Sequence, residues 1–166
     1  DFYSANAMYR SNGIVKALVV GDYQVSFGQM LTIGTGLAFG KSAQVLSTKR
    51  NSNGIRPYNS VNEVSFLRGI ATTIALGKIT ITPYYSRVWN DANFSVVDSL
   101  NIEDIEDISS FYLSGYHRTE NELAKKRNTL MQTYGANVQY AKRNFTLGLT
   151  YNAIELNKKI APDEKI

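Results

Sequence analysis

The sequence contains no cysteine, one histidine and three prolines among 166 residues. Without cysteine there is no disulfide framework and no thiolate ligand for a metal. A single histidine, His117, excludes a metal site or a proton relay built from several imidazoles. No nucleophile–base arrangement can be assembled around His117, and no paired carboxylates share a strand face. We therefore predict that the protein is not an enzyme and that it holds no metal and no cofactor.

Long apolar runs are also missing. Although 43% of the residues are hydrophobic, no stretch approaches the ~18 consecutive apolar residues of a transmembrane helix. A transmembrane β-strand needs an apolar residue only at every second position, so this class stays open. The chain begins DFYSANAMYR, which alternates like a strand and lacks the features of a signal peptide. We expect a mature form or a piece of a longer chain.

The charges do not favour nucleic acid or nucleotide binding. The net charge is +4, and the basic residues are scattered without forming a stripe interleaved with stacking aromatics. The stretch GTGLAFGKS, residues 34–42, is similar to a phosphate-binding loop. That motif needs a glycine five residues before Gly40, where Thr35 stands, and no helix-forming run follows. We expect no nucleic-acid partner.

Alternation with period two is the dominant pattern, and it predicts β-strands. Globular strands usually have about five or six residues, whereas a strand that crosses a bilayer at a tilt needs ~9–11. The alternating runs have this greater length, which favours a membrane-spanning sheet. The six runs are Phe2–Arg10, Ile14 to about Gly28, Val64–Leu76, Ile79–Trp89, Met131–Ala141 and Phe145–Leu156.

The connections alternate between short and long. Ser11–Gly13, Gly77–Lys78 and Lys142–Asn144 have the length of hairpin turns, whereas about 29–62, about 90–130 and the tail after 156 are long. Short turns at one end and long loops at the other are typical of outer-membrane barrels. We predict an all-β fold, an antiparallel meander of about six long strands that forms part of a transmembrane β-barrel across residues 1–166.

The two faces of the predicted strands differ in chemistry. On the run from Ile14, the side with Val19, Tyr23 and Val25 is predicted to face lipid, and on the third run the side with Ala71. A charged residue that faced lipid would cost ~2–4 kcal/mol at the bilayer midplane. The charged and polar residues on the opposite side are therefore predicted to face a wet lumen. These lumen residues are Lys16, Asp22, Gln24, Arg68 and Arg87.

Aromatic residues gather near both ends of the strands, as membrane interfaces select. Aromatics also favour strands in general; of the two explanations, we favour a girdle at each interface. The predicted girdle residues are Tyr9, Tyr140 and Phe145 near the short turns, and Phe27, Trp89, Tyr134 and Tyr151 near the loops.

Two of the long loops carry further signals. A helical insert is predicted at about 98–128, because Ile102, Ile105, Ile108 and Tyr112 recur near helical spacing and Thr119–Glu122 matches a capping box. The glycine-rich loop from Gly28 to Asn62 is predicted to fold inward and pack on the barrel wall or plug the lumen. Alternatively, residues 29–39 merely extend the second strand above the membrane.

The inward loop needs polar anchors. We predict that Arg50, Arg56 and Tyr58 attach it to inward groups such as Asp22 or Glu63.

Several stretches together resemble a known family. They are GDYQVSFGQMLTIGTGLAFGKSA, KRNSNGIRPYNSVNEVSFLRGIATT, PYYSR and SGYHRTENEL, in this order along nearly the whole chain. The sequence is similar to large Bacteroidetes outer-membrane proteins that are commonly labelled helix-hairpin-helix domain-containing. Met30 stands where a glycine is expected after FGQ, and the helix-hairpin-helix portion is missing, so no DNA-related role transfers. The resemblance implies an integral outer-membrane location and a barrel, but no reaction.

Three functions follow from these observations. We expect an outer-membrane barrel protein of the bacterial envelope with a structural, assembly or partner-binding role. Its partners are the outer-membrane lipid, the remaining strands of the same protein, and other outer-membrane or surface proteins bound by its loops. The alternatives are a channel or transporter for small solutes and a soluble β-sandwich binding module.

Overall fold

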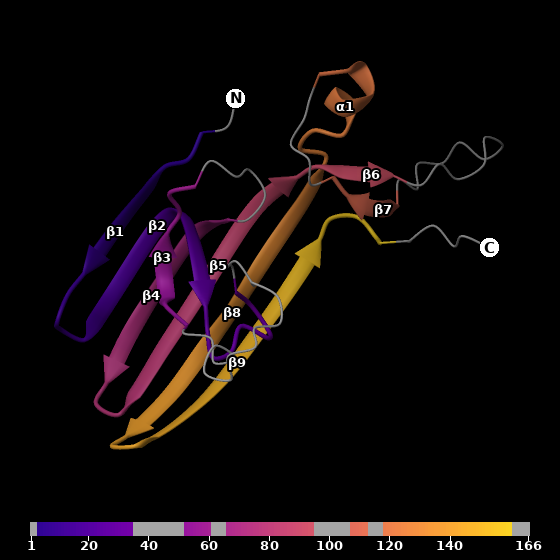
Figure 1. Cartoon of the computed structure of the whole chain (residues 1–166). Helices are drawn as coiled ribbons and strands as arrows, with labels where there is room; N and C mark the ends of the chain where they lie inside the picture. Colours follow the sequence, from indigo (N-terminus) through magenta and orange to yellow (C-terminus); the bar gives the residue numbers. More distant parts are fainter. Residues whose placement is uncertain (1–2, 35–51, 61–65, 95–106, 113–117, 161–166) are drawn as a thin grey trace, which may run out of the picture. The chain divides into compact units, whose positions relative to one another are not determined.

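Figure 1 shows a computed structural model, which describes residues 3–34, 52–60, 66–94, 107–112 and 118–160. The fold of these residues is all-β and mostly antiparallel, as predicted. Six strands form a meander in the order β1-β2-β4-β5-β8-β9. They are β1 (Asn6–Arg10), β2 (Val15–Ser26), β4 (Leu67–Leu76), β5 (Ile79–Asn90), β8 (Thr129–Lys142) and β9 (Phe145–Leu156).

The hairpin connections are short, as the sequence indicates. Gly77–Lys78 joins β4 to β5, and Arg143–Asn144 joins β8 to β9. Gly77 has a φ of 64° and Arg143 a φ of 46°, the left-handed conformation that two-residue hairpin turns require. The β1–β2 turn is tied by the Gly13 amide, which donates to Ser11 Oγ at 3.0 Å. Figure 1 shows these three turns at the same end of the sheet.

Three shorter strands complete the described fold. β3 (Gly54–Pro57) pairs antiparallel with the last third of β2, while β6 (Ala92–Phe94) and β7 (Ile108–Phe111) form a separate two-stranded sheet. Within the described residues, no helix is long and apolar enough to cross a membrane. The chain divides into two compact units, Asp1–Ser86 with Thr133–Ala153, and Arg87–Gln132 with Ile154–Ile166.

The helical insert predicted over 98–128 is not seen. Ile108–Phe111, which was assigned to a helix, is strand β7, and the only helix of the described part is the five-residue α1 (Glu120–Ala124). Pairing with β6 gives β7 hydrogen bonds that a lone helical turn cannot match. The pair is also joined by the side chain of Asn93, whose Nδ2 donates to Ser110 Oγ at 2.9 Å. Ile102, Ile105 and His117 lie outside the described residues.

The capping box is present at the start of α1. The Glu122 amide donates to Thr119 Oγ1 at 3.2 Å, and the Glu122 carboxylate accepts from the amides of Arg118 at 2.7 Å and Thr119 at 3.2 Å. These contacts, led by that with Arg118, hold the pKa of Glu122 below its ordinary value. Local sequence therefore identified the helix start correctly, although the helix is shorter than the predicted insert.

Candidate functional site

The sheet of the first unit has two faces of opposite chemistry. Along β5 the burial alternates strictly between Thr82 and Ser86 on one side and Tyr85 on the other. The strand registers carry this division across the sheet, since Val20 faces Ile70 and Ile70 faces Tyr85. We call the exposed side the apolar face. Its large exposed side chains are Tyr9, Val20, Ile70, Leu76, Ile79, Tyr85, Val138, Tyr140, Phe145, Leu147, Leu149 and Tyr151.

The opposite side, which we call the polar face, carries small and hydrogen-bonding side chains over β8 and β9, and on β2 it carries Val19 and Tyr23 of the buried core. Several of its hydroxyl and amide groups join across strands. Thr73 and Thr82 share a hydrogen bond of 3.2 Å, and Asn137 Nδ2 donates to Thr150 Oγ1 at 2.8 Å. Water-soluble sheets usually place their polar residues outward and their large apolar residues inward, and the β8–β9 hairpin has the reverse arrangement, with Leu147, Leu149 and Tyr151 exposed.

Tyr84 packs closely against the backbone of Gly135 on the polar face. Tyr84 Oη donates to Asn152 Oδ1 at 2.9 Å, and this hydroxyl and the end of the ring lie over Gly135. A Cβ at position 135 would collide with the Tyr84 hydroxyl and with the Tyr151 carbonyl oxygen. Glycine is therefore required where the tyrosine crosses β8. Sequence periodicity did not identify this pair, because the two residues lie 51 positions apart.

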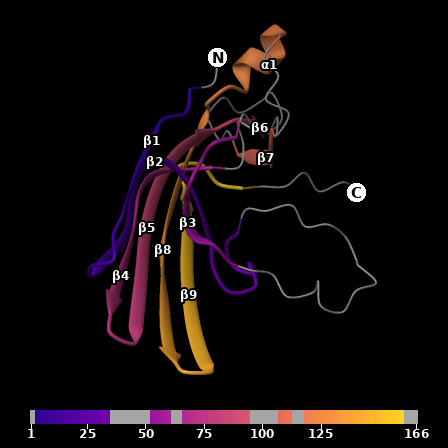
Figure 2. The same cartoon turned by 60° about the vertical axis from the view of Figure 1, so that its left-hand side comes forward.

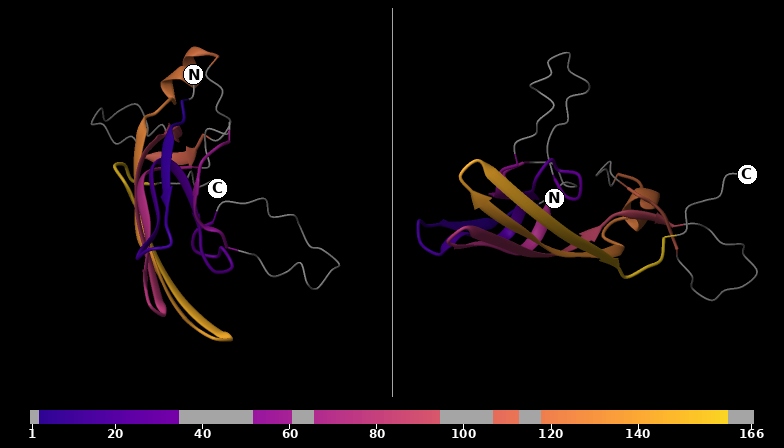
Figure 3. Two further views of the ribbon diagram at one scale, coloured as in Figure 1. Left: turned by 90° about the vertical axis from the view of Figure 1, so that its left-hand side faces the viewer. Right: turned by 90° about the horizontal axis from the view of Figure 1, so that it is seen from below.

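β2 leaves the sheet of long strands after Tyr23, the ninth of its twelve residues. It pairs with β1 up to Gly21 and with β4 up to Tyr23, and beyond that point only with β3. Gly21 has a φ of 99°, and a Cβ there would collide with the Ala5 carbonyl oxygen. We call the last three residues of β2 with Phe27, together with β3 and Tyr58, the flap (residues 24–27 and 54–58). Figures 2 and 3 show β3 to one side of β4 and β5.

The flap packs its apolar side chains onto the polar face. Val25, Phe27 and Ile55 form the buried core together with Val19, Tyr23, Ala71 and Tyr84. The rings of Phe27 and Tyr84 lie 5.9 Å apart between centroids. Within the loop Gly28–Asn62 that was predicted to fold inward, Ile55 packs in this core, and residues 35–51 lie outside the described residues.

The face assignments for β2 and β4 were wrong. Val19, Tyr23 and Val25 were expected to face lipid, but they are at most 1% exposed under the flap, whereas Val20 is 49% exposed. Ala71 is likewise buried and its neighbour Ile70 is exposed. Both sides of these strands are apolar, so alternation alone could not tell which side would be covered.

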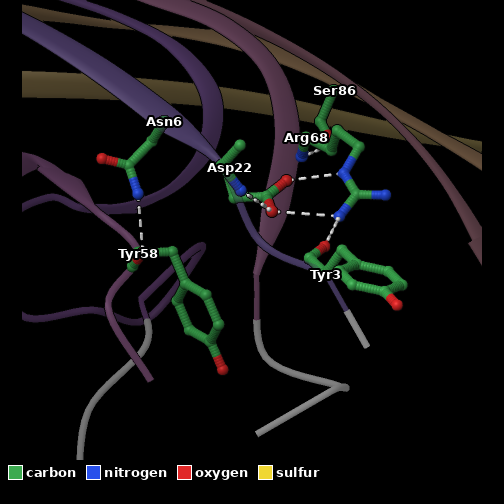
Figure 4. Close-up of polar contacts among 7 residues, drawn as sticks. Tyr3, Asn6, Asp22, Tyr58, Arg68 and Ser86 are labelled. Atoms are coloured by element: carbon green, nitrogen blue, oxygen red, sulfur yellow. Dashed lines mark hydrogen bonds and ion pairs between the residues drawn. The ribbon is translucent and has the colours of Figure 1, made fainter. Parts of the chain in front are cut away.

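A polar cluster lies at the end of the sheet where the flap begins (Figure 4). Asp22 is 1% exposed, and its carboxylate accepts from Arg68 Nε at 2.6 Å and from the second guanidinium nitrogen at 3.0 Å. The same guanidinium donates to the Tyr3 carbonyl oxygen, and the Ala5 amide donates to Asp22 Oδ2. Asp22 and Arg68 are directly opposite in the register of β2 and β4. This bidentate pair joins two residues that were predicted to face the lumen. Their strand positions instead fall on the same side as Val20 and Ile70, which is the apolar face.

Tyr58 anchors the flap to this cluster through its backbone. The Tyr58 amide donates to the Asp22 carbonyl oxygen at 3.0 Å, and Asn6 Nδ2 donates to the Tyr58 carbonyl oxygen at 2.8 Å. The Tyr58 ring is buried 5.4 Å from the Phe66 ring. These contacts place the backbone of Tyr58 against Asp22, one of the groups to which the loop was expected to attach.

Arg56 does not share the anchoring role of Tyr58. It is exposed on β3, so its anchoring role was predicted wrongly. The guanidinium on Asp22 belongs to Arg68 instead, because β4 and not β3 lies opposite Asp22. Arg50 and Glu63 lie outside the described residues.

The remaining predicted polar residues are dispersed. Gln24 is half-buried in the flap opposite Arg56. Lys16 is exposed beside the first turn, where its Nζ donates to the Asn12 carbonyl oxygen at 2.8 Å. Arg87 is exposed on β5, on the same side of the strand as Tyr85 and Trp89, and therefore not on the polar side predicted for it.

Most predicted girdle aromatics are exposed, but not all. Phe27 is 8% exposed in the core under the flap, which corrects its assignment to an interface belt. Tyr134 is half-buried. The exposed members are Tyr9, Trp89, Tyr140, Phe145 and Tyr151.

In the second unit, the side chains of Asn128 and Asp91 hold the start of β6, a contact that the sequence analysis did not predict. Asn128 brackets Ala92, accepting from its amide at 3.0 Å and donating to its carbonyl oxygen at 2.9 Å. Asp91 accepts from the Arg127 amide at 2.7 Å. These side chains imitate a strand partner and satisfy backbone groups at the start of β6. Their role is structural.

No family model, curated protein or solved structure matches the chain.

Proposed function

We propose that the protein is an integral outer-membrane protein of the bacterial envelope, in which the six-strand meander is part of a transmembrane β-barrel. The apolar face meets lipid and the polar face meets the lumen. The observation that carries this proposal is the reversed polarity of the β8–β9 hairpin, with exposed Leu149 and Tyr151 on one side and hydrogen-bonded Thr150 and Asn152 on the other. A soluble sandwich instead buries its large apolar side chains between sheets.

The distribution of charge supports the same location. Residues 69–77, 79–86, 128–141 and 144–154 contain no charged residue, although Arg68, Lys78, Arg87, Lys142 and Glu155 stand at their boundaries. From Phe145 to Ala153 a strand advances about 27 Å, or about 20 Å across a membrane at a tilt of ~40°. Barrels have an apolar band about 25 Å tall, so the charge-free stretches have a suitable length.

The edges of the sheet imply further strands. Within the described residues, β1 pairs with β2 alone and β9 with β8 alone, so each has one backbone edge without a strand partner. Open edges are not tolerated in lipid, because unpaired amide and carbonyl groups cost several kcal/mol each. We propose that the remaining strands of the same protein pair with these edges. This agrees with the resemblance to Bacteroidetes outer-membrane barrel proteins.

Within the envelope we favour a structural or partner-binding role. The flap covers part of the polar face, and its core of Val25, Phe27 and Ile55 occupies space that an open pore would leave to water. Conductance of the full-length protein across a planar bilayer would favour the alternative of a channel or transporter. Co-purification with other outer-membrane proteins would support the preferred role.

The location is tested by lipid contact. Trp89 is the only tryptophan, is 50% exposed and lies on the same side of β5 as Tyr85. In vesicles of brominated phosphatidylcholine, we expect its fluorescence to be strongly quenched relative to unbrominated vesicles. The chain should also stay in the membrane fraction through a urea wash. Release by urea together with unquenched fluorescence would overturn the proposal.

A further inference from the structure

Three cations gather at the turn end of the sheet. Lys78 lies in the β4–β5 turn, Lys142 ends β8, and Arg143 occupies the β8–β9 turn. The Ala141 amide donates to the Lys78 carbonyl oxygen at 2.9 Å, which places the two turns side by side. Lys78, Ala141, Lys142 and Arg143 line a depression of about 620 Å³. We call Lys78, Lys142 and Arg143 the basic cluster.

The positive charge of the cluster is not neutralised nearby. Residues 64–90 and 128–154 contain no aspartate or glutamate, and within the described part of the chain none of the three cations makes an ion pair. The neighbouring β1–β2 turn adds Arg10 and Lys16, and the Ala75 amide donates to the Ile14 carbonyl oxygen at 2.8 Å beside it. The turn end therefore presents a row of cations that attracts anions.

Arg143 is not the residue that the turn itself would favour. Its φ of 46° lies in the left-handed region, which glycine and asparagine adopt more readily than arginine. The left-handed position of the turn is that of Arg143, since Asn144 does not have a positive φ. Backbone preference therefore does not explain an arginine here, and its exposed side chain adds a positive charge beside Lys142.

The apolar side chains around the basic cluster indicate that the bound anion is a lipid. Exposed apolar side chains adjoin both turns: Leu76 and Ile79 flank Gly77–Lys78, and Phe145 follows Asn144. A cationic rim above an apolar face fits a molecule with an anionic head and acyl chains. Resting on the proposed membrane location, we propose that the basic cluster binds the headgroup phosphate of an anionic glycerophospholipid, whose acyl chains lie along the apolar face.

The test uses a tryptophan placed beside the cluster. In the full-length protein, Trp89→Phe and Phe145→Trp move the tryptophan of residues 1–166 to a position that is 58% exposed in the native chain, and any tryptophan outside these residues is replaced by phenylalanine. Quenching by brominated phosphatidylglycerol and by brominated phosphatidylcholine, each mixed with the other unbrominated lipid, gives the relative affinity of the two lipids. We expect the affinity for phosphatidylglycerol to be about fivefold higher than that for phosphatidylcholine, which is the factor that one basic residue near an anionic surface contributes.

A cluster variant should abolish this preference. Lys78→Gln, Lys142→Gln and Arg143→Asn together should bring the affinity ratio to about one while quenching by phosphatidylcholine persists. The matched control is Lys125→Gln, Lys126→Gln and Arg127→Asn, which removes the same charges and relaxes another left-handed arginine, with a φ of 50°. The control should keep the preference.

The outcomes separate the two proposals. No quenching by either lipid contradicts the membrane location. Quenching by both lipids with a ratio near one in the reporter protein overturns only the lipid site, as does equal loss in the control variant. If inorganic phosphate removes the preference and chloride at the same ionic strength does not, the cluster binds free phosphate, and the lipid assignment is wrong.

Discussion

At the scale of single residues, Gly135 decides whether Tyr84 can lie across β8. A methyl group at 135 would meet both the Tyr84 hydroxyl and the Tyr151 backbone. Because the backbone cannot retreat as a flexible side chain does, we expect Gly135→Ala to lower the free energy of unfolding by about 1–3 kcal/mol. Chemical unfolding in detergent micelles, followed by Trp89 fluorescence, measures this change.

Gly148 on the neighbouring strand provides the control. A Cβ there would find no atom closer than the Val138 carbonyl oxygen at 4.0 Å. Gly148→Ala should therefore leave stability unchanged or raise it slightly, since alanine restricts the unfolded chain. Equal losses for the two variants would contradict the contact between Tyr84 and Gly135.

The pair of Asp22 and Arg68 holds the start of the flap. Arg68→Ala would leave a buried carboxylate without its cation, and we expect a loss of about 1–3 kcal/mol, less than for a fully buried pair. The expected loss is smaller than for a fully buried pair because the Arg68 side chain is 44% exposed, so solvent screens the interaction. Arg56→Ala removes an exposed arginine of the flap and should change stability by less than about 0.5 kcal/mol. The reverse order would show that β3 supplies the anchor after all.

At the scale of elements, the register of β2 and β3 defines the flap. Gln24 and Arg56 are direct partners in this pair. Since the native chain has no cysteine, Gln24→Cys with Arg56→Cys gives a single possible disulfide. We expect it to form under mild oxidation, because the side chains of directly opposite residues lie on the same face. Mass spectrometry of the linked peptides detects it.

The negative control for this register is the pair Val25→Cys with Arg56→Cys. Val25 points into the core, whereas Arg56 is exposed. Neighbouring residues of a strand face opposite ways, so this pair should stay reduced. Efficient linkage of the control pair would mean that the register is shifted by one residue.

The helix α1 should respond to pH through its capping box. The pKa of Glu122 is lowered by the amides of Arg118 and Thr119. The stabilising contact is thus fully present above the ordinary glutamate pKa and is lost as pH falls through the lowered value. Amide chemical shifts of Arg118 and Thr119 should titrate with a midpoint below that of an ordinary glutamate. A midpoint at or above it would refute the capping contact, and Glu122→Gln should remove the titration.

At the scale of the whole molecule, the apolar face should reject charge where the polar face accepts it. Val138 and Gln139 are consecutive and exposed on β8 but face opposite ways. In a bilayer, Val138→Arg should cost about 2–4 kcal/mol near the midplane. Gln139→Arg should cost much less, because its side points to water. Folding efficiency in vesicles compares the two variants.

A soluble sheet predicts another result for this pair. Both positions are exposed, and an exposed arginine on a soluble strand changes stability by at most about 0.5 kcal/mol. Equal and small effects for Val138→Arg and Gln139→Arg would therefore count against a lipid-facing surface.

Local patterns in the sequence predicted the six strands of the meander and the short turns between them, but not β3, β6 or β7. The run Phe145–Leu156 was predicted with the bounds that β9 has, and Gly77–Lys78 was predicted as the turn that it forms. Alternation and turn chemistry are properties of neighbouring residues, so they can be read without tertiary structure. The capping box at Thr119 was predicted for the same reason.

Only the tertiary structure decided which side of each strand is covered and which residues meet. Val19 and Val20 are chemically alike, and the flap alone makes the first buried and the second exposed. Ile108 fits a helix by spacing but pairs with Phe94 in a sheet. Arg68, rather than Arg56, reaches Asp22 because β4 lies opposite it. Each outcome depends on contacts between distant segments, whose packing and hydrogen bonds outweigh local preference.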